Sequence, residues 1–320
     1  MMLLIKMLRK LTYTTIVVLV LGIAFFTALK VNFTREIIKS VYYFGYKETL
    51  KFKFSNCVVN NLKKDISSKI IIAGHTYGLP AHTNNATYPK FLYALESEIN
   101  QKNKVRDLNK IILAGDIVKV ANEKNFLEVK EKLKKFTNEL VVAPGNHDFG
   151  PKIFGDIKNQ NIFLKVFNQS FQSIDYKNNL FLILDTASVT GNITKEQIEF
   201  IKKEINKKTN WTNIFIITHH VVWSEMMTQK GYKIFPNLPE IKTNNFEDLL
   251  SIIKKINTKT NIYLFAGDIA VATAHTKLFC EKERNIYYIA TGMGNGRMDN
   301  YIRLEFSDDG NSFNIKPIFF

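Results

Sequence analysis

The fold is decided by residues 141–148, which read Val-Val-Ala-Pro-Gly-Asn-His-Asp. The apolar start is typical of a buried β-strand that ends at the Pro-Gly pair, and the loop then carries Asn, His and Asp side by side. Two other stretches have the same form: 111–116 ends in Gly-Asp, and 214–220 ends in His-His. Three apolar strands that each end in metal-ligand residue types predict one site at the carboxyl edge of a sheet, where open α/β folds bind ligands.

The rest of the body alternates strands with helices and ends in a hairpin. Apolar strands are expected at 69–73, 110–114, 214–218, 261–266 and 286–290, and helices at 88–101, 122–136, 194–207 and 244–257. Hairpins are expected at 171–184 and 301–318, where short polar turns separate two runs of strand-forming residues. This order predicts a mixed pair of sheets with helices outside them.

Length and composition indicate a folded protein of one large domain or two modest ones. The chain has 320 residues, of which 46% are hydrophobic and 12% aromatic, so general disorder is not expected. The formal net charge of +15 admits nucleic acid, an anionic membrane surface or an anionic substrate as a partner. The lysines are scattered through stretches such as 128–135 and 202–208, with no arginine-rich arm. Solvated lysine faces are therefore favoured, attraction to lipid headgroups comes second, and nucleic acid is not the expected partner.

An uncharged stretch at 11–29 predicts a single membrane anchor, because nineteen helical residues span roughly 28 Å, close to the thickness of a bilayer core. Basic residues at 6, 9 and 10 favour a cytoplasmic amino end and an extracytoplasmic body, whereas those at 30, 35 and 39 weaken that orientation. No Ala-x-Ala cleavage site is present, so the segment is expected to stay uncleaved. We therefore expect a short cytoplasmic segment at 1–10, the anchor in the lipid bilayer at 11–29, a juxtamembrane segment at 30–65 and the main domain at 66–320.

The two cysteines, Cys57 and Cys280, lie far apart in the chain and outside any metal-binding spacing. A disulfide between them is compatible with a body outside the cytosol. Sequence alone does not show whether the two sulfurs meet, so the pairing stays open at this stage.

The residues after the three strands suit a centre for divalent metal and phosphate, which needs oxygen donors and imidazoles converging from separate strands. Asp116 can bridge two cations through its two oxygens, Asn146 offers a neutral carbonyl oxygen, and His219 offers a nitrogen. His147 lies beside Asp148, which could orient its ring, and this pair suits proton donation to a leaving oxygen. Water activated by the cation would be the nucleophile.

These motifs resemble those of the calcineurin-like metallophosphoesterases. Gly115-Asp116, the Gly-Asn-His-Asp run at 145–148 and the strand-final His219 are similar to the family's second, third and fourth motifs. Leu-Asp-Thr at 184–186, followed by Gln197, is similar to its middle region, and the resemblance runs from about residue 70 to residue 306. It implies an α/β (α+β) fold, a two-sheet β-sandwich flanked by helices, which here would follow an N-terminal transmembrane helix. It also implies a two-metal centre and phosphoester hydrolysis.

Two motifs depart from the family pattern. The first motif, Asp-x-His in the family, is Ala-Gly-His at 73–75, so Ala73 stands where the family has a carboxylate. The last motif, Gly-His-x-His in the family, is Gly-Asp-Ile-Ala at 267–270. Asp268 and Ala270 therefore stand where the family has two imidazoles.

Carried over position by position, the resemblance implies five metal ligands in two sites. One site keeps Asp116, Asn146 and His219, with Asp268 as an oxygen replacement for an imidazole. The other site keeps only His75 and the bridging Asp116. One or two divalent ions are expected, and mixed nitrogen and oxygen ligands do not distinguish among Mn, Fe and Zn.

The two altered loops are neighbours in the family's fold, which suggests an exchange between them. We hypothesise that Asp268 takes the place in space of the carboxylate that is missing at Ala73. The alternative is decay, in which the pocket kept its strand ends and lost tight metal binding.

Other candidate residues have simpler interpretations. His220 is expected to be a neighbour of the ligand His219, because alternation along a strand turns it to the opposite face. His82 and His275 are interpreted as loop histidines, although His275 could supply a missing imidazole. Tyr77 could contact a phosphate oxygen, but packing is the favoured reading. The glycine-rich run at 292–296 could present backbone N–H groups to phosphate, but a plain turn is favoured.

The sequence as a whole predicts a membrane-anchored, metal-dependent phosphoesterase that hydrolyses a phosphomonoester or a phosphodiester. The alternative, motivated by Ala73 and Ala270, is a catalytically degenerate member of the same fold. Such a protein would act as a binding or assembly module at the cell envelope, with envelope proteins as partners. A third hypothesis, nucleic-acid processing, is prompted only by the basic charge.

Overall fold

The computed structural model describes residues 35–58, 60–62, 66–78, 87–100, 108–150, 156–188, 191–237, 245–269, 277–294 and 296–320. The chain divides into two compact units, residues 1–49 and 50–320, and the helix α2 (Arg35–Cys57) runs across the division. Among the described residues, no helix combines the length and the apolar character that a membrane crossing needs. The predicted anchor at 11–29 lies outside the described residues.

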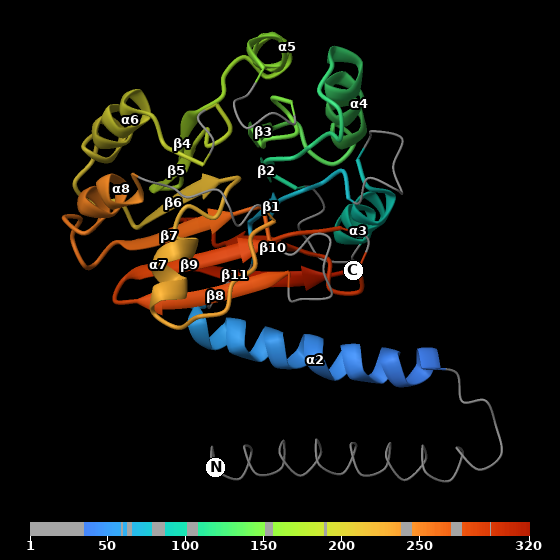
Figure 1. Cartoon of the computed structure of the whole chain (residues 1–320). Coiled ribbons are helices and arrows are strands. Elements are labelled where there is room, and N and C mark those ends of the chain that lie inside the picture. Colours follow the sequence, from blue (N-terminus) through green and yellow to red (C-terminus); the bar gives the residue numbers. More distant parts are fainter. Residues whose placement is uncertain are drawn as a thin grey trace, which may run out of the picture. The chain divides into compact units, whose positions relative to one another are not determined.

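Five strands form the first sheet, which carries the first three predicted strand ends (Figure 1). β1, β2 and β3 run parallel, and β10 and β11 complete the sheet as an antiparallel hairpin beside β1. In spatial order the strands are β11 (Phe313–Phe319), β10 (Asn300–Phe306), β1 (Ser68–Ala73), β2 (Lys110–Ala114) and β3 (Leu140–Ala143). The predicted C-terminal hairpin is therefore confirmed.

Six strands form the second sheet, which carries the later strand ends. β5, β6, β7 and β9 run parallel, and the edge strands β4 and β8 are antiparallel to their neighbours. In spatial order the strands are β4 (Gln172–Tyr176), β5 (Asn179–Ile183), β6 (Asn213–Thr218), β7 (Asn261–Ala266), β9 (Ile286–Thr291) and β8 (Leu278–Glu283). The predicted hairpin at 171–184 is confirmed, and its tip residues Lys177 and Asn178 have φ angles of 48° and 61°, the left-handed values of a type I′ turn. β8 was not predicted.

The two sheets pack face to face because alternate residues of each strand point to opposite sides. Ile70 and Ile72 of β1 meet Phe215 and Ile217 of β6 in one buried cluster between the sheets. The intervening Ile71 lies in a second cluster on the outer face of the first sheet. Both faces of the central strands are buried, which explains why these strands read as continuous apolar runs.

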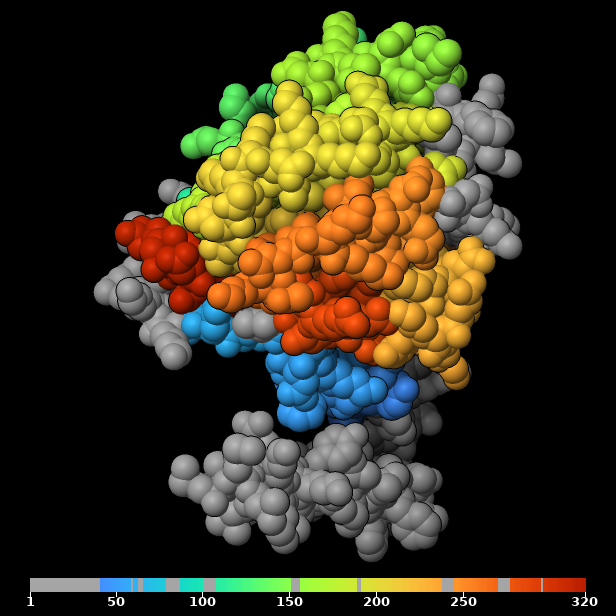
Figure 2. Space-filling model, turned by 90° about the vertical axis from the view of Figure 1, so that its left-hand side faces the viewer, coloured from blue at the N-terminus to red at the C-terminus, as the bar shows by residue number. Residues whose placement is uncertain are grey.

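Helices cover the outer faces, as the sequence predicted. α3 (Pro89–Asn100), α4 (Glu123–Leu133) and α5 (Ile157–Phe167) pack on the first sheet. α6 (Lys195–Ile205), α7 (Ser224–Gln229) and α8 (Phe246–Ile253) pack on the second, and Figure 2 views the face that α6 and α8 cover. The expected capping pattern opens α6, because the Thr194 side chain accepts a hydrogen bond from the Gln197 N–H. The resulting order of helix, sheet, sheet and helix is the predicted flanked sandwich.

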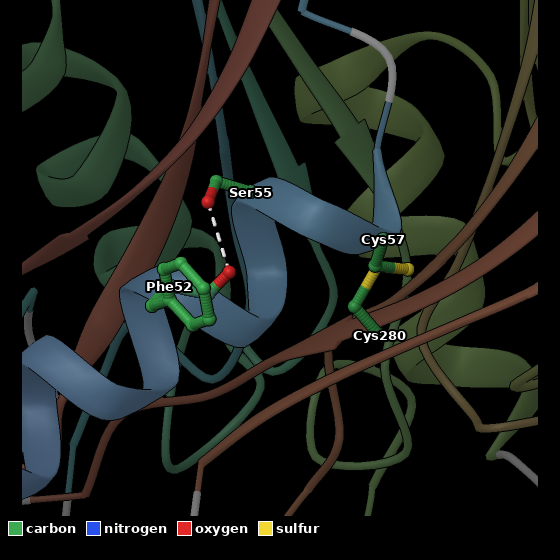
Figure 3. The surroundings of a disulfide bond; sticks show 4 residues. All are labelled: Phe52, Ser55, Cys57 and Cys280. Carbon is green, nitrogen blue, oxygen red and sulfur yellow. Dashed lines mark hydrogen bonds between the residues drawn. A yellow bond between two sulfur atoms is a disulfide. The ribbon is translucent and has the colours of Figure 1, made fainter. Parts of the chain in front are cut away.

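A disulfide joins Cys57 to Cys280 and settles the pairing that sequence left open (Figure 3). The two Cα atoms lie 6.1 Å apart, within the normal range for a disulfide. The bond ties the last turn of α2 to the edge strand β8, and the neighbouring Phe54 and Val58 are buried in the cluster between the sheets. The residues from Leu50 to Val58 are therefore part of the folded body.

Candidate metal centre

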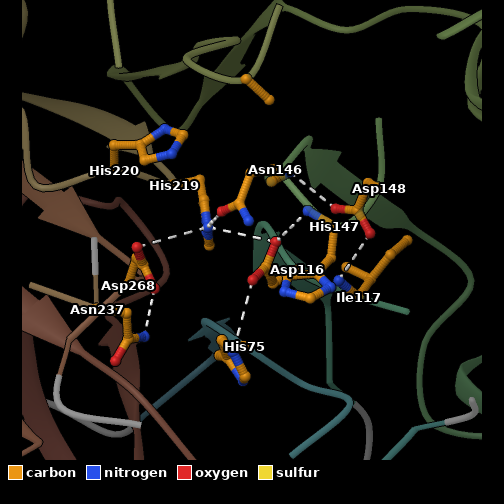
Figure 4. Close-up of polar contacts among 12 residues, drawn as sticks. His75, Asp116, Ile117, Asn146, His147, Asp148, His219, His220, Asn237 and Asp268 are labelled. Atoms are coloured by element: carbon orange, nitrogen blue, oxygen red, sulfur yellow. Dashed lines mark hydrogen bonds and ion pairs between the residues drawn. The ribbon is translucent and has the colours of Figure 1, made fainter. Parts of the chain in front are cut away.

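Loops from both sheets converge on one point at the carboxyl ends of the parallel strands (Figure 4). The first sheet supplies the loops after β1, β2 and β3, and the second supplies those after β6 and β7. All five predicted metal ligands lie in these loops and approach one another: His75, Asp116, Asn146, His219 and Asp268. The site is therefore built from strand ends that are far apart in the sequence.

Asp116 lies at the centre of this site and faces both sides of it. Its Oδ2 is 3.5 Å from Nε2 of His75, and its Oδ1 is 3.3 Å from Nε2 of His219. Oδ1 also accepts a hydrogen bond of 2.9 Å from the backbone N–H of His147. Gly115 (φ 78°) and Asp116 (φ 54°) are both left-handed, which turns the chain sharply after β2, and a Cβ at Gly115 would overlap the His219 ring. One carboxylate thus divides the site into a His219 side and a His75 side.

The His219 side is oriented by a backbone carbonyl. Nδ1 of His219 lies 3.0 Å from the carbonyl oxygen of Ala114, which can only accept, so Nδ1 carries the proton. Nε2 therefore faces the site, 3.1 Å from Oδ1 of Asn146 and 3.9 Å from Oδ2 of Asp268. A ring held in this way through its other nitrogen is typical of metal-ligating histidines.

The His75 side contains the two altered motifs. Ligand atoms of His75, Asp116 and Asp268 all lie within 4.8 Å of one another. Gly74 and Gly267 bring the two loops together, because their backbones approach so closely that a Cβ on Gly74 would overlap Gly267. This contact is how an acid that follows β7 reaches the histidine that follows β1.

Ala73, where the family has its first carboxylate, is completely buried in the apolar cluster on the outer face of the first sheet. Asp268 lies beside His75, and its Oδ1 accepts a hydrogen bond from the Asn237 side chain. Sequence reasoning missed Asn237, which precedes Asp268 by 31 residues and belongs to no motif. Only the backbone contacts between 236–237 and 268–269 place it there.

Burial and mutual contact set the charges of the site. Burial alone would raise the pKa of Asp116, but His219, His147 and His75 hold it below its ordinary value. Burial alone would lower the pKa of His219, but Asp116 and Asp268 raise it. Burial lowers the pKa of His75 to about 4 and raises that of Asp268. Asp116 is thus a carboxylate whose ionised form is stabilised by the surrounding histidines.

His147 lies at the solvent-facing side of the site, and the group that orients its ring is not the expected Asp148. Its Nδ1 is 3.1 Å from the carbonyl oxygen of Lys119, so the ring is oriented by that carbonyl and not by Asp148. Asp148 is buried and accepts hydrogen bonds from the backbone N–H groups of Ile117, Val118 and Gly145. Burial and the nearby Asp116 raise the pKa of Asp148 to about 7. Asp148 therefore joins the loops after β2 and β3.

The remaining candidates have defined positions where the structure describes them. Tyr77 is buried, and its ring centroid lies 4.3 Å from that of His75 and 5.2 Å from that of His147, so it packs against the site. The N–H groups of Gly294 and Gly296 donate to Asp299, so these two are not free for phosphate. His82, Ala270 and His275 lie outside the described residues.

The donor set fits a divalent cation. Within the described part of the chain, the ion-pair partners of the buried Asp116 and Asp268 are histidines only, and no lysine or arginine pairs with them. Buried carboxylates without a fixed positive partner are costly, and a bound cation removes that cost. Among the residues that the structure describes, two groups of three side chains could hold an ion: His75, Asp116 and Asp268, and His219, His220 and Asp268.

Comparison with known proteins agrees with the motifs. The sequence model of the family described as calcineurin-like phosphoesterase matches residues 82–240, a range that includes Asp116, Asn146 and His219. His75 and Asp268, in the two altered motifs, lie outside that range. The chain therefore carries a calcineurin-like phosphoesterase domain, which confirms the family resemblance.

One curated relative is the 3′,5′-cyclic adenosine monophosphate phosphodiesterase CpdA of Haemophilus influenzae, which is 25% identical over 128 residues. The match covers 39% of this chain and 44% of that protein, so it spans less than half of the relative's length. Among solved structures, the phosphopantetheinyl hydrolase PptH of Mycobacterium tuberculosis is similar with a TM-score of 0.45 and 9% identity, over 72% of this chain and 91% of that one.

Proposed function

We propose that the chain is a metal-dependent phosphoester hydrolase held at a membrane by residues 11–29. The observation that carries this proposal is the convergence of three retained family ligands on one buried carboxylate. Asp116, Asn146 and His219 come from three different strand ends. Nε2 of His219 lies 3.1 Å from Oδ1 of Asn146 and 3.3 Å from Oδ1 of Asp116.

Five side chains would hold the metal: His75, Asp116, Asn146, His219 and Asp268. A bound divalent cation supplies Lewis acidity, which activates water and neutralises charge on the phosphoryl oxygens. The Ala114 carbonyl keeps Nε2 of His219 turned toward the site. Mixed nitrogen and oxygen donors suit Mn, Fe or Zn.

His147 is the residue proposed to donate a proton to the leaving oxygen. The Lys119 carbonyl engages its Nδ1, so Nε2 is the atom left to face a substrate. His147 and Asn146 are the partly exposed members of a site whose other residues are buried. A substrate would therefore approach from the side of His147, and its leaving group would meet this imidazole first.

A phosphodiester is the favoured substrate class. The curated relative is named as a phosphodiesterase of 3′,5′-cyclic adenosine monophosphate, which makes a cyclic nucleotide the first compound to test. The match to that protein is partial, so linear phosphodiesters and phosphomonoesters belong in the same assay.

The proposed location is a membrane with the main domain on its extracytoplasmic side. The uncharged stretch at 11–29 and the basic residues before it support this arrangement. The Cys57–Cys280 disulfide supports it independently, because disulfides persist in oxidising compartments. Reporter fusions after Phe320 that are active only on the cytosolic side would overturn the orientation.

The function is tested with the full chain, purified in detergent, stripped of metal with a chelator and reloaded with Mn²⁺, Fe²⁺ or Zn²⁺. Cyclic AMP, bis(p-nitrophenyl) phosphate and p-nitrophenyl phosphate are offered in turn. We expect turnover that requires metal and is lost in Asp116→Asn. A chain that binds metal and leaves all three compounds intact would contradict the proposal.

The second candidate is a binding or assembly module that has lost catalysis. The observation in its favour is Ala73, which is completely buried among apolar side chains where the family places a metal-binding carboxylate. A chain that stays free of metal and inactive in the same assay would favour this candidate.

A further inference from the structure

One ring nitrogen of His220 makes no hydrogen bond with the part of the chain that the structure describes. The side chain is buried, with 4% of its surface exposed, and Nε2 has no hydrogen-bond partner among the described residues. A buried polar atom that loses its water contacts without a replacement costs free energy, so such atoms are rare in folded proteins. Within the described ranges no group occupies this position, so Nε2 is available to a bound ligand.

The ring is held in place through its other nitrogen. Nδ1 of His220 lies 3.0 Å from Oγ1 of Thr186, and the same hydroxyl oxygen accepts the backbone N–H of His220. Thr186 follows β5, the strand next to β6, so the contact joins two adjacent strand ends. Engagement of one ring nitrogen by the protein, with the other left for a ligand, is the arrangement found around metal-binding histidines.

The backbone also explains why the expected orientation of His220 does not apply. β6 ends at Thr218, and the next two residues form a bend in which the His220 carbonyl accepts hydrogen bonds from the Thr218 hydroxyl and the Val222 N–H. Alternation between faces holds only within a strand. Consecutive histidines after a strand can therefore both turn toward one point.

His220 lies in a group that can share an ion. Ligand atoms of His219, His220 and Asp268 are all within 4.8 Å of one another, and all three side chains are buried. Donors bound tetrahedrally to one zinc ion at about 2.1 Å lie about 3.4 Å apart, so the group would close by up to about 1.4 Å around an ion. In Figure 4, His219 lies between His220 and Asp116.

We propose that His220 binds a divalent cation through Nε2, together with His219 and Asp268. The imidazole of His220 thereby replaces one of those missing from the last motif at 267–270. This inference rests on the proposed metal-dependent function and enlarges its ligand set. It assigns to His220 a role that neither the motifs nor the alternation of the strand predicted.

The test measures cobalt binding by the full chain in detergent. His220→Asn places an amide nitrogen near the position of Nδ1, which keeps the contact with Thr186, and has no atom at the position of Nε2. Tyr263→Phe is the matched control, because it removes a different buried polar atom without a described partner, the Tyr263 hydroxyl, from the packed interior between the sheets. Stoichiometry is measured by elemental analysis, and coordination by visible absorption of Co²⁺.

We expect His220→Asn to lose one equivalent of cobalt, or to bind it at least about tenfold more weakly with an altered spectrum. Tyr263→Phe should match the unaltered chain. If His220→Asn retains the stoichiometry, affinity and spectrum of the unaltered chain, the ligand role of His220 is wrong and the proposed function stands. If the unaltered chain binds no cobalt, both fail together.

A crystal of the unaltered full chain soaked in Mn²⁺ decides the matter even where His220→Asn does not fold. An anomalous peak at bonding distance from Nε2 of His220, about 2.1 to 2.3 Å, supports the proposal. Peaks confined to the His75 side of Asp116 overturn it.

Discussion

The two sides of Asp116 present similar donor groups that come from different parts of the sequence. On the His219 side, Asn146 and His219 come from motifs that the chain keeps intact, and each can be recognised from its own strand and loop. On the His75 side, the carboxylate that should follow β1 is replaced by Ala73, and Asp268 approaches from the other sheet. The comparison teaches that a metal site is defined by where donors meet in space, so an acid can be lost from one loop and gained on its neighbour.

The hypothesised exchange of a carboxylate would need little rearrangement, because the two loops already touch. The chain after β1 and the chain after β7 meet at Gly74 and Gly267, and a side chain on Gly74 would separate them. His75 and Asp268 each follow one of these glycines directly. A carboxylate on either loop can therefore reach the same volume.

The largest effect is expected from Asp116→Asn, because this change removes the carboxylate that both sides share. Loss of a residue that only orients a metal ligand lowers metal affinity or activity by about 10–100-fold. We therefore expect loss of the shared ligand itself to lower kcat/KM by about 10³-fold or more. The assay is metal-dependent hydrolysis of bis(p-nitrophenyl) phosphate, with metal content measured in parallel. Asp308→Asn is the control, since Asp308 is a fully exposed carboxylate at a hairpin. Equal losses in both variants would show that Asp116 has no special role.

Gly267→Ala tests the contact between the sheets. A Cβ at Gly267 would overlap the carbonyl oxygen of Ala114, which is backbone and cannot rotate away. We expect the free energy of unfolding to fall by about 3 kcal/mol, measured by urea denaturation. Gly45→Ala in α2 should raise stability or leave it unchanged, because nothing lies within 4 Å of a Cβ there. A Gly267→Ala chain as stable as the original would show that the loop after β7 does not need this close approach to Ala114.

Asp268→Asn distinguishes the two hypotheses for the His75 side, namely that Asp268 replaces the missing carboxylate or that tight metal binding has been lost. Asparagine keeps an oxygen and the size of the side chain but removes the charge, so metal affinity should fall by about 100-fold, as judged by titration with Mn²⁺. Decay predicts instead that the change has no effect, because no tight site would remain to be weakened. The double variant Ala73→Asp with Asp268→Asn should recover part of the affinity if the two positions serve one volume.

Asn237→Ala is expected to have the smallest effect. Its side chain donates to Oδ1 of Asp268 and so holds the carboxylate without touching the metal itself. Metal affinity should fall by about tenfold, while the fold is retained. Asn311→Ala, at an exposed turn, serves as the control. A loss as large as that in Asp268→Asn would indicate that Asn237 is itself a ligand.

Local patterns predicted most of the fold because each is read within one element. Apolar runs marked the central strands, and spacing of 3.6 residues marked α4, whose Phe126, Val129 and Leu133 are all buried. The edge strand β8, whose residues between Leu278 and Glu283 are partly buried or exposed, lacked a continuous apolar run and was missed. Edge strands have one open side, so their sequences carry a weaker signal.

Local sequence patterns predicted the site less completely than they predicted the fold. Motifs identified Asp116, Asn146 and His219, since each follows an apolar strand directly. They suggested the wrong ring partner for His147, because adjacency in sequence placed Asp148 beside it, whereas the structure directs Asp148 to three backbone N–H groups. Asn237 carried no signal at all.

The sequence by itself determined the strands, their polar ends and the family, because these depend on residues that are close along the chain. Only the tertiary structure decided that Asp268 meets His75, that His220 turns toward the same centre and that Cys57 pairs with Cys280. Each of these contacts joins segments from different sheet strands or helices. Their distances follow from how the strands, sheets and helix α2 pack together, which no single stretch of sequence encodes.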